Sequence, residues 1–251
     1  MCEKTAPPFC ASPGRIDGLM SLPKTQALRT LDEVIAHRSR LLVQYQGDRL
    51  SQRYADLVTR IAGAEEACRP GSQTLANAAA RGYYKFLAIK DEYEVARLHA
   101  DLEFLDAIDR EFEGDYRLKF HLAPPRLAKR ETATGQLKKS TYGSWLMVAF
   151  KLLSRLRFIR NTFADPFART QERRFELGLL ERYEAAAQLV IDNLNSSNFE
   201  QCVSLLSYPD QVRGFGHVRE ASHRRIAPEI DRLIMAIEET KIQPAPDLRV
   251  A

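Results

Sequence analysis

Most of the chain carries the hydrophobic spacing of amphipathic α-helices. Apolar residues recur at every third or fourth position, which places them on one face of a helix. The clearest stripe runs from Val95 to Phe112 and predicts one uninterrupted helix of about five turns, which Gly114 ends. The spacing predicts seven helices, over residues 26–45, 50–68, 75–87, 95–112, 144–156, 171–194 and 221–240, with a short helical segment at 199–207. We therefore predict a mainly α fold, a bundle-like domain of about seven helices.

One short stretch, EFEGDYRLKFHLAPP from Glu111 to Pro125, departs from the helical pattern. Its middle alternates apolar and basic positions, which is the period of a half-buried β-strand. The apolar positions are Tyr116, Leu118, Phe120 and Leu122, and those between them are Arg117, Lys119 and His121. Further on, Thr134-Gly135 is typical of a turn between two short polar arms. We expect a small β-ribbon inserted near residues 115–143, with its apolar face on the helices and its basic face outward.

The ribbon lies in the most basic part of the chain. Between Arg117 and Arg160 there are eleven Lys or Arg residues and one acid, Glu131, although the formal net charge of the whole chain is only +4. The charges could simply keep the ribbon soluble, or they could form a docking surface for phosphates or an acidic partner. No recognised nucleic-acid module accompanies them, so nucleic acid is the less expected partner. The candidate phosphate- or partner-binding residues are Arg117, Lys119, His121, Arg126, Lys129, Arg130, Lys138 and Lys139.

Residue groups with the spacing of known catalytic or metal sites are missing from the sequence. The five histidines form neither HxH nor HExxH, and the cysteines contain no CxxC pair. We therefore name no catalytic residue and predict no metal site and no bound cofactor in this chain. The loop RGFGHV, Arg213 to Val218, has two glycines but neither a third glycine nor a preceding strand. This favours a tight turn over a dinucleotide-binding fingerprint.

The acids Asp91, Glu92 and Glu94 in KDEYEVARL admit two structural interpretations. Carboxylates in the first turn of a helix are stabilised by the helix dipole, so they could cap a helix that begins there. Alternatively they could form a buried ionic contact, with Lys90 or Arg97 as partner. Neither interpretation requires catalysis.

The ends of the chain and the apolar runs indicate how it is organised. The first 24 residues are rich in Pro and Gly and lack the apolar core of a signal peptide, so we expect a disordered leader at 1–24. A single mainly helical domain is expected at 25–240, and a flexible tail at 241–251. No apolar run reaches the length of a membrane span. We expect a cytoplasmic protein with no membrane partner, in which Cys2, Cys10, Cys68 and Cys202 are free thiols.

Four strings in one order resemble a known family. They are YKFLAIKDEYEVARL (Tyr84 to Leu98), FEGDYRLKFHLAPP (Phe112 to Pro125), the arms around ATGQLKK, and RGFGHV (Arg213 to Val218). The segments FKLLSRLRFIRNTFADPF and TQERRFELGLLERYEA add to the likeness. Together they resemble the C-terminal segment of fused bacterial indolepyruvate ferredoxin oxidoreductases, which are 2-oxoacid:ferredoxin oxidoreductases. The resemblance covers roughly Leu31 to Glu238.

The resemblance implies a role within a larger enzyme. That family oxidatively decarboxylates arylpyruvates to acyl-CoA with thiamine diphosphate, and iron–sulfur clusters pass the electrons to ferredoxin. Both cofactors are held by other parts of the long chain, and no catalytic residue of the family falls in the matching strings. The resemblance thus implies a C-terminal domain or split fragment whose partners are the catalytic domains, with its basic ribbon near them or near CoA phosphates. The alternative is a non-enzymatic interaction module that binds an acidic partner or nucleic acid through the ribbon.

Overall fold

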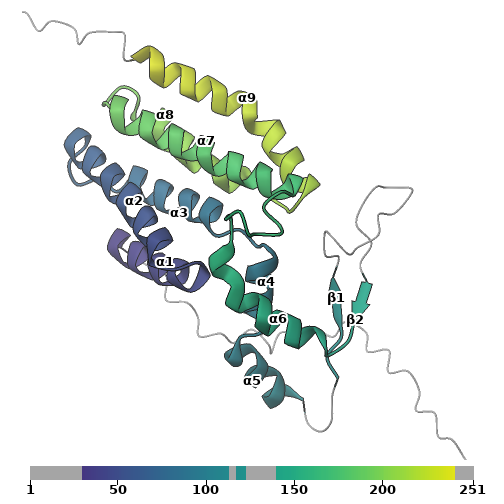
Figure 1. Cartoon of the computed structure of the whole chain (residues 1–251). Coiled ribbons are helices and arrows are strands. Elements are labelled where there is room, and N and C mark those ends of the chain that lie inside the picture. Colours follow the sequence, from purple (N-terminus) through teal and green to yellow (C-terminus); the bar gives the residue numbers. More distant parts are fainter. Residues whose placement is uncertain (1–29, 113–116, 123–139, 241–251) are drawn as a thin grey trace, which may run out of the picture.

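The computed structural model describes residues 30–112, 117–122 and 140–240, and within them the protein is mainly α-helical (Figure 1). This confirms the predicted fold class, and the described residues form nine α-helices where about seven were expected. The helices are α1 (Leu31–Tyr45), α2 (Asp48–Cys68), α3 (Thr74–Leu87), α4 (Glu92–His99), α5 (Leu102–Glu111), α6 (Leu146–Arg155), α7 (Gln171–Asn193), α8 (Phe199–Ser207) and α9 (His217–Thr240). Two short 3-10 turns, η1 (Leu156–Ile159) and η2 (Tyr208–Gln211), extend α6 and α8, and β1 (Phe120–Leu122) pairs with β2 (Ser140–Tyr142).

Six helices, α1, α2, α3, α7, α8 and α9, share the larger hydrophobic core. Each contributes the stripe that its sequence predicts, and these stripes meet because burying them removes apolar surface from water. Tyrosines stack through the middle of the core: the ring of Tyr83 lies 6.0 Å from that of Tyr54 and 5.8 Å from that of Tyr183. The Tyr183 hydroxyl donates to the Leu206 carbonyl at 3.1 Å, so this buried polar group is satisfied.

Gly82 sits where α3 comes closest to the end of α8. A Cβ at this position would lie 2.7 Å from the Leu206 carbonyl oxygen and 2.9 Å from Pro209 Cγ. We expect Gly82→Ala to destabilise the fold by about 1–3 kcal/mol, because backbone atoms must move to admit the methyl group. A Cβ on Gly63, in α2, would have no such neighbour within 4 Å, so Gly63→Ala serves as the control. It should stabilise by about 0.5–1 kcal/mol. Urea unfolding of both variants measures the contrast, and equal effects would contradict the packing described.

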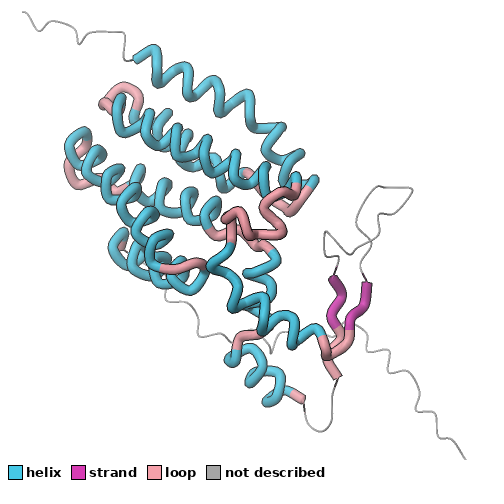
Figure 2. The backbone as a smooth tube through the Cα atoms, in the orientation of Figure 1, coloured by secondary structure: helices cyan, strands magenta, loops and turns pink. Residues whose placement is uncertain are grey.

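The smaller hydrophobic cluster joins α4, α6 and the ribbon. Its buried members are Ala96, Phe120 and Phe150, and the two phenyl rings meet edge to face with centroids 5.3 Å apart. Figure 2 shows the two strands in magenta, next to the start of α6. They are antiparallel, with Phe120 opposite Tyr142.

The described part of the ribbon has the predicted alternation. Phe120 is buried and Leu118 and Leu122 are partly buried, whereas Arg117, Lys119 and His121 are exposed. The predicted two faces are therefore confirmed for these residues. Tyr116 and the predicted turn at Thr134-Gly135 lie outside the described residues, as do the predicted leader and tail.

The prediction of one continuous helix over 95–112 is wrong. The stripe is divided between α4 and α5, because Asp101 accepts a hydrogen bond from the Glu103 backbone N–H and starts a new helix there. An aspartate at this position satisfies an amide that the first turn leaves unpaired, and so competes with helix continuation. Leu102 and Phe104 are exposed, and Ile108 is the buried residue of α5. Hydrophobic periodicity alone therefore overestimated how much of this segment is buried.

None of the helices within residues 30–112 and 140–240 is both long enough and apolar enough to cross a membrane.

Candidate functional site

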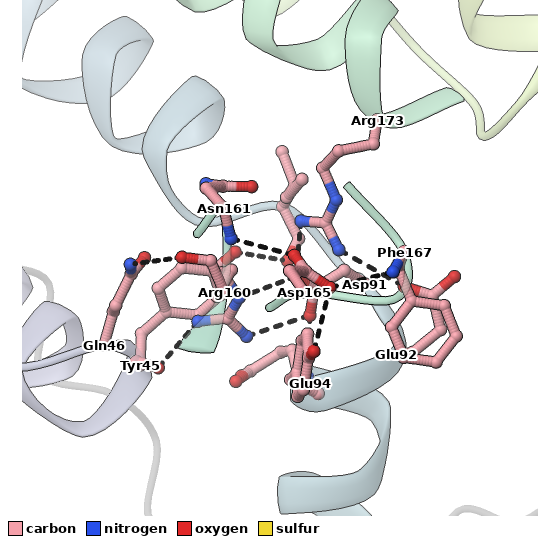
Figure 3. Close-up of polar contacts among 12 residues, drawn as sticks. Tyr45, Gln46, Asp91, Glu92, Glu94, Arg160, Asn161, Asp165, Phe167 and Arg173 are labelled. Atoms are coloured by element: carbon pink, nitrogen blue, oxygen red, sulfur yellow. Dashed lines mark hydrogen bonds and ion pairs between the residues drawn. The ribbon is translucent and has the colours of Figure 1, made fainter. Parts of the chain in front are cut away.

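Asp91 lies at the start of α4, where it is both a helix cap and a buried charge (Figure 3). Its Oδ1 accepts a hydrogen bond from the Glu94 backbone N–H at 2.9 Å, which confirms the capping interpretation. The ionic interpretation is also confirmed. Of the two predicted partners, Arg97 pairs with Glu94 at 2.7 Å. Asp91 instead accepts from the guanidinium groups of Arg160 and Arg173, which were not predicted as partners. One carboxylate thus combines both roles.

Arg160 contacts both carboxylate oxygens of Asp91. Its Nε donates to Oδ2 at 2.6 Å and its Nη2 donates to Oδ1 at 2.9 Å, which is a bidentate pair. The third nitrogen, Nη1, donates to the Tyr45 carbonyl at 2.8 Å, and the guanidinium lies 3.7 Å from the centre of the Tyr45 ring. Lys151 and Arg155 on α6 are exposed, whereas Arg160 is buried. Asn161 has a positive φ of 61°, so the chain turns sharply after η1 and Arg160 points inward.

Arg173 approaches the same carboxylate from α7. Its Nη1 donates to Asp91 Oδ2 at 2.6 Å, and its Nη2 donates to Glu92 Oε2 at 3.2 Å. Burial by itself raises the pKa of Asp91, but the hydrogen bonds and charges of the two arginines lower it below its ordinary value. Burial raises the pKa of Glu92, whose contact with Arg173, at 3.2 Å, is longer than that of Asp91. We call Asp91, Glu92, Arg160 and Arg173 the ion-pair junction.

A second buried carboxylate, Asp165, supports the loop that leads to Arg173. It accepts from the Tyr93 hydroxyl at 2.9 Å, from the Asn161 backbone N–H at 2.8 Å and from the Phe167 backbone N–H at 2.9 Å. These three contacts fix the loop around the ion-pair junction. Burial, together with the hydrogen bond to Asp165, raises the pKa of Tyr93, so this phenol stays neutral.

The ion-pair junction connects the two hydrophobic clusters. Arg173 on α7 and Tyr45 on α1 belong to helices of the larger cluster, whereas Asp91 caps α4 and Arg160 follows α6, which belong to the smaller one. Every charge in it is paired, and no serine, cysteine or histidine among the described residues donates to or accepts from its four side chains. Its geometry is that of a structural ionic link between the two clusters.

A cavity of about 1000 Å³ borders the junction. Its walls come from the α3–α4 connection, α6, the start of α7 and the loop before α9, with Leu122 of the ribbon at one side. Most of the lining is apolar, and Asp91, Glu92 and Arg173 form part of one wall. The cavity is lined by residues of five of the sequence strings on which the family resemblance rests. The fold therefore brings segments more than 100 residues apart to one place.

The loop RGFGHV forms one wall of this cavity and has the geometry of a tight turn. Gly214 and Gly216 have φ values of 91° and 53°, which favour glycine. A Cβ on Gly216 would lie 2.9 Å from Glu172 Oε1. The predicted tight turn with close backbone approach is confirmed.

The three described residues of the predicted basic site lie outside the lining of the cavity. Arg117, Lys119 and His121 are exposed on or before β1, where His121 Nδ1 lies 3.1 Å from Thr141 Oγ1, and none of the three lines the cavity. The other five candidates lie outside the described residues: Arg126, Lys129, Arg130, Lys138 and Lys139. That these eight residues together bind a phosphate or a partner stays a prediction.

The exposed apolar face of α6 was not predicted from the sequence. Trp145, Val148 and Leu152 are 62%, 72% and 62% exposed, and their spacing places them side by side along the helix. We call these three residues the α6 outer face. The signal was in the sequence: WLMVAF is apolar on every side, so a helix that buries one apolar stripe must expose another. The ring of Trp145 lies edge-on to Tyr142 of β2 at 6.1 Å, so this face adjoins the ribbon.

Within the described residues, no group of three or more His, Cys, Asp or Glu side chains could hold a metal ion. Cys68 and Cys202 are free thiols, and burial raises the pKa of Cys202 to about 12. Iron–sulfur clusters need cysteine thiolates, so this pair does not fit such a cluster.

A family model matches residues 31–232. The chain belongs to the DUF6537 family. That family is described as one of unknown function. The DUF6537 match spans all the helices from α1 to most of α9, and therefore the junction, the cavity and the α6 outer face. Neither the curated proteins nor the solved structures include a significant match to the chain.

Proposed function

We propose that the chain is a C-terminal domain or split fragment of an indolepyruvate-type 2-oxoacid:ferredoxin oxidoreductase. In such an enzyme an arylpyruvate is oxidatively decarboxylated to an acyl-CoA, and ferredoxin accepts the electrons. In this proposal the chain contributes structure and docking, and the catalytic centre belongs to the other domains. The resemblance of the quoted strings supports the assignment to that enzyme class. The observation that carries the docking role is the α6 outer face.

The α6 outer face has the properties of an unoccupied contact surface. Three large apolar side chains in one row are unusual on a surface that meets only water, and such patches mark interaction sites. Burying each would contribute roughly 1.5–3 kcal/mol to an association. Arg117 and Lys119, on the adjoining ribbon, would add charge complementarity to an acidic surface on a catalytic domain or to the phosphates of CoA.

The cofactors of the proposed parent enzyme belong elsewhere in this scheme. Thiamine diphosphate and the iron–sulfur clusters would be held by the catalytic domains. The two described thiols do not fit a cluster, as noted above, and Cys2 and Cys10 lie outside the described residues.

The docking role predicts that charges on the α6 outer face abolish association. In Val148→Asp/Leu152→Asp, two exposed residues become carboxylates, so the fold should be retained while the apolar contact is lost. We expect co-purification of the thiamine-diphosphate-dependent subunit with the tagged chain to fall at least tenfold. Met235→Asp on α9 is the matched control, because Met235 is 60% exposed and lies far from α6 in the chain. Equal recovery with both variants would contradict docking through α6.

The second candidate function is an interaction module that does not belong to an enzyme. The observation that favours it is the exposed basic face of β1, with Arg117 and Lys119. This module should bind polyglutamate or single-stranded RNA with an affinity that falls steeply as salt rises.

For this candidate, Arg117→Gln/Lys119→Gln should reduce the salt dependence of RNA binding by about two counterions. The control Arg224→Gln/Arg225→Gln removes the same charge from α9 and should leave that dependence unchanged. Fluorescence anisotropy from about 50 to 200 mM salt measures it. If both variants change binding alike, only overall charge matters and the basic face is not the site.

A further inference from the structure

One end of the cavity carries an incompletely paired buried arginine. Arg219, in the first turn of α9, lines the cavity and is only 8% exposed. Its Nε lies 2.7 Å from Glu176 Oε1, which forms an ion pair. Its Nη2 is buried and has no hydrogen-bond partner among the described residues. A guanidinium carries five N–H donors, and a buried donor left unpaired is costly, so this side chain has capacity for another acceptor.

The surroundings of Arg219 do not supply that acceptor. Lys85 and Arg213 line the cavity together with Arg219, and the three cations lie close to one another. Their proximity is evident in Lys85: burial lowers its pKa, Arg219 and Arg213 lower it further, and Asp210 opposes them. The Lys85 ammonium donates to the Pro209 carbonyl at 2.6 Å. The carboxylates Glu172, Glu176 and Glu220 also line the cavity, but Arg219 Nη2 has no hydrogen bond to any of them, so a ligand carboxylate can still pair with it.

The rest of the cavity is suited to an apolar group. Its wall includes Val95, Phe150, Leu153, Phe167 and Phe175. The volume of about 1000 Å³ is at the upper end of the range for small-molecule sites, which are typically apolar with a few polar groups that orient the ligand. A free phosphate would leave this wall unused, and an uncharged hydrocarbon would leave the arginine unpaired.

We propose that the cavity binds a small organic carboxylate with an extended apolar body, and that Arg219 recognises the carboxylate. The apolar body lies between α6 and the start of α7, and the carboxylate accepts from the guanidinium at the α9 end. The inference goes beyond the docking role and does not depend on it, because binding can be measured on the full chain without any partner.

The test compares charged and uncharged probes by isothermal titration calorimetry. Decanoate and 2-naphthoate supply a carboxylate on an aliphatic and an aromatic body, and decanol and 2-naphthalenemethanol supply the same bodies without charge. We expect at least one carboxylate to bind the wild-type chain with one-to-one stoichiometry, roughly tenfold or more tighter than its alcohol. Arg219→Gln should remove that difference, and Ala149→Trp, which adds bulk at a lining position on α6, should weaken both.

If neither carboxylate binds, or if acid and alcohol bind equally well to the wild-type chain, the proposal is overturned. Circular dichroism establishes that Arg219→Gln is folded. If that variant unfolds, the comparison of acid with alcohol and the effect of Ala149→Trp still decide the matter. Carboxylate binding that Ala149→Trp leaves unchanged would place the ligand outside the cavity and also overturn the proposal.

Discussion

Asp91→Asn should cost about 3–5 kcal/mol of folding free energy, because it removes the charge that compensates Arg160 and leaves Arg173 with only the longer contact to Glu92. Asparagine can still cap α4, so the substitution isolates the ionic role from the capping role. The melting temperature should fall by roughly 6–15 °C for a chain of this size. Differential scanning calorimetry at pH 7 measures the change.

The matched control for Asp91→Asn is an exposed ion pair. Glu229 and Arg232 form one on the surface of α9, and Glu229→Gln should change stability by less than about 1 kcal/mol. If Asp91→Asn were as mild as Glu229→Gln, the ion-pair junction would not hold the two clusters together.

The effect of Asp91 should also depend on pH, in a direction fixed by its lowered pKa. A carboxyl group whose pKa is lower in the folded state stabilises the fold above its unfolded pKa of about 3.9. That contribution is lost as the pH falls through the folded value. The difference between the wild-type chain and Asp91→Asn should therefore be full at about pH 5–7 and shrink in acid below about pH 4.

Glu65→Ala should be the other strongly destabilising change, with a loss of about 3 kcal/mol or more. Glu65 is fully buried at the end of α2 and accepts hydrogen bonds from the backbone N–H groups of Leu75 and Ala76, at 3.0 and 2.8 Å. These amides belong to the first turn of α3, whose own N-cap residue, Gln73, makes no side-chain cap. Alanine would leave two buried donors unpaired and remove a negative charge from the positive end of the α3 dipole.

The adjacent residue gives the control for Glu65→Ala. Glu66 is exposed and accepts from the Gly71 backbone N–H at 2.9 Å. Glu66→Ala should cost less than about 1 kcal/mol, since water can replace its contact. Guanidinium unfolding of both variants measures the difference. Similar losses from the two neighbouring substitutions would mean that α3 does not depend on a cap from α2.

The core of the bundle could be predicted because it follows local periodicity. Tyr54, Tyr83 and Tyr183 lie in helices predicted from spacing alone, and all three are buried. The ribbon could be predicted for the same reason, since alternation indicates its two faces. The boundary at Asp101 was missed because a cap and a continuing stripe compete there, and hydrophobic spacing does not weigh the hydrogen bond that decides between them.

The ion-pair junction could be predicted only in part. Asp91 was recognised as a cap or a buried ionic partner, but Arg160 and Arg173 are indistinguishable in the sequence from solvated helix arginines. Their burial depends on a turn at Asn161 and on contacts across 69 and 82 positions of the chain. The cavity and the unpaired donor of Arg219 also depend on long-range packing, so no local sequence pattern predicts them.

The most direct test of the central proposal is a reconstituted enzyme assay. The purified full chain is mixed with the remaining parts of the 2-oxoacid:ferredoxin oxidoreductase, and the reduction of ferredoxin or a viologen dye is followed with indolepyruvate and CoA. We expect CoA-dependent reduction to rise several-fold when the wild-type chain is added, to stay low with Val148→Asp/Leu152→Asp, and to rise fully with Met235→Asp. A rate that is the same with and without the chain would contradict the proposal that it is a working part of this enzyme.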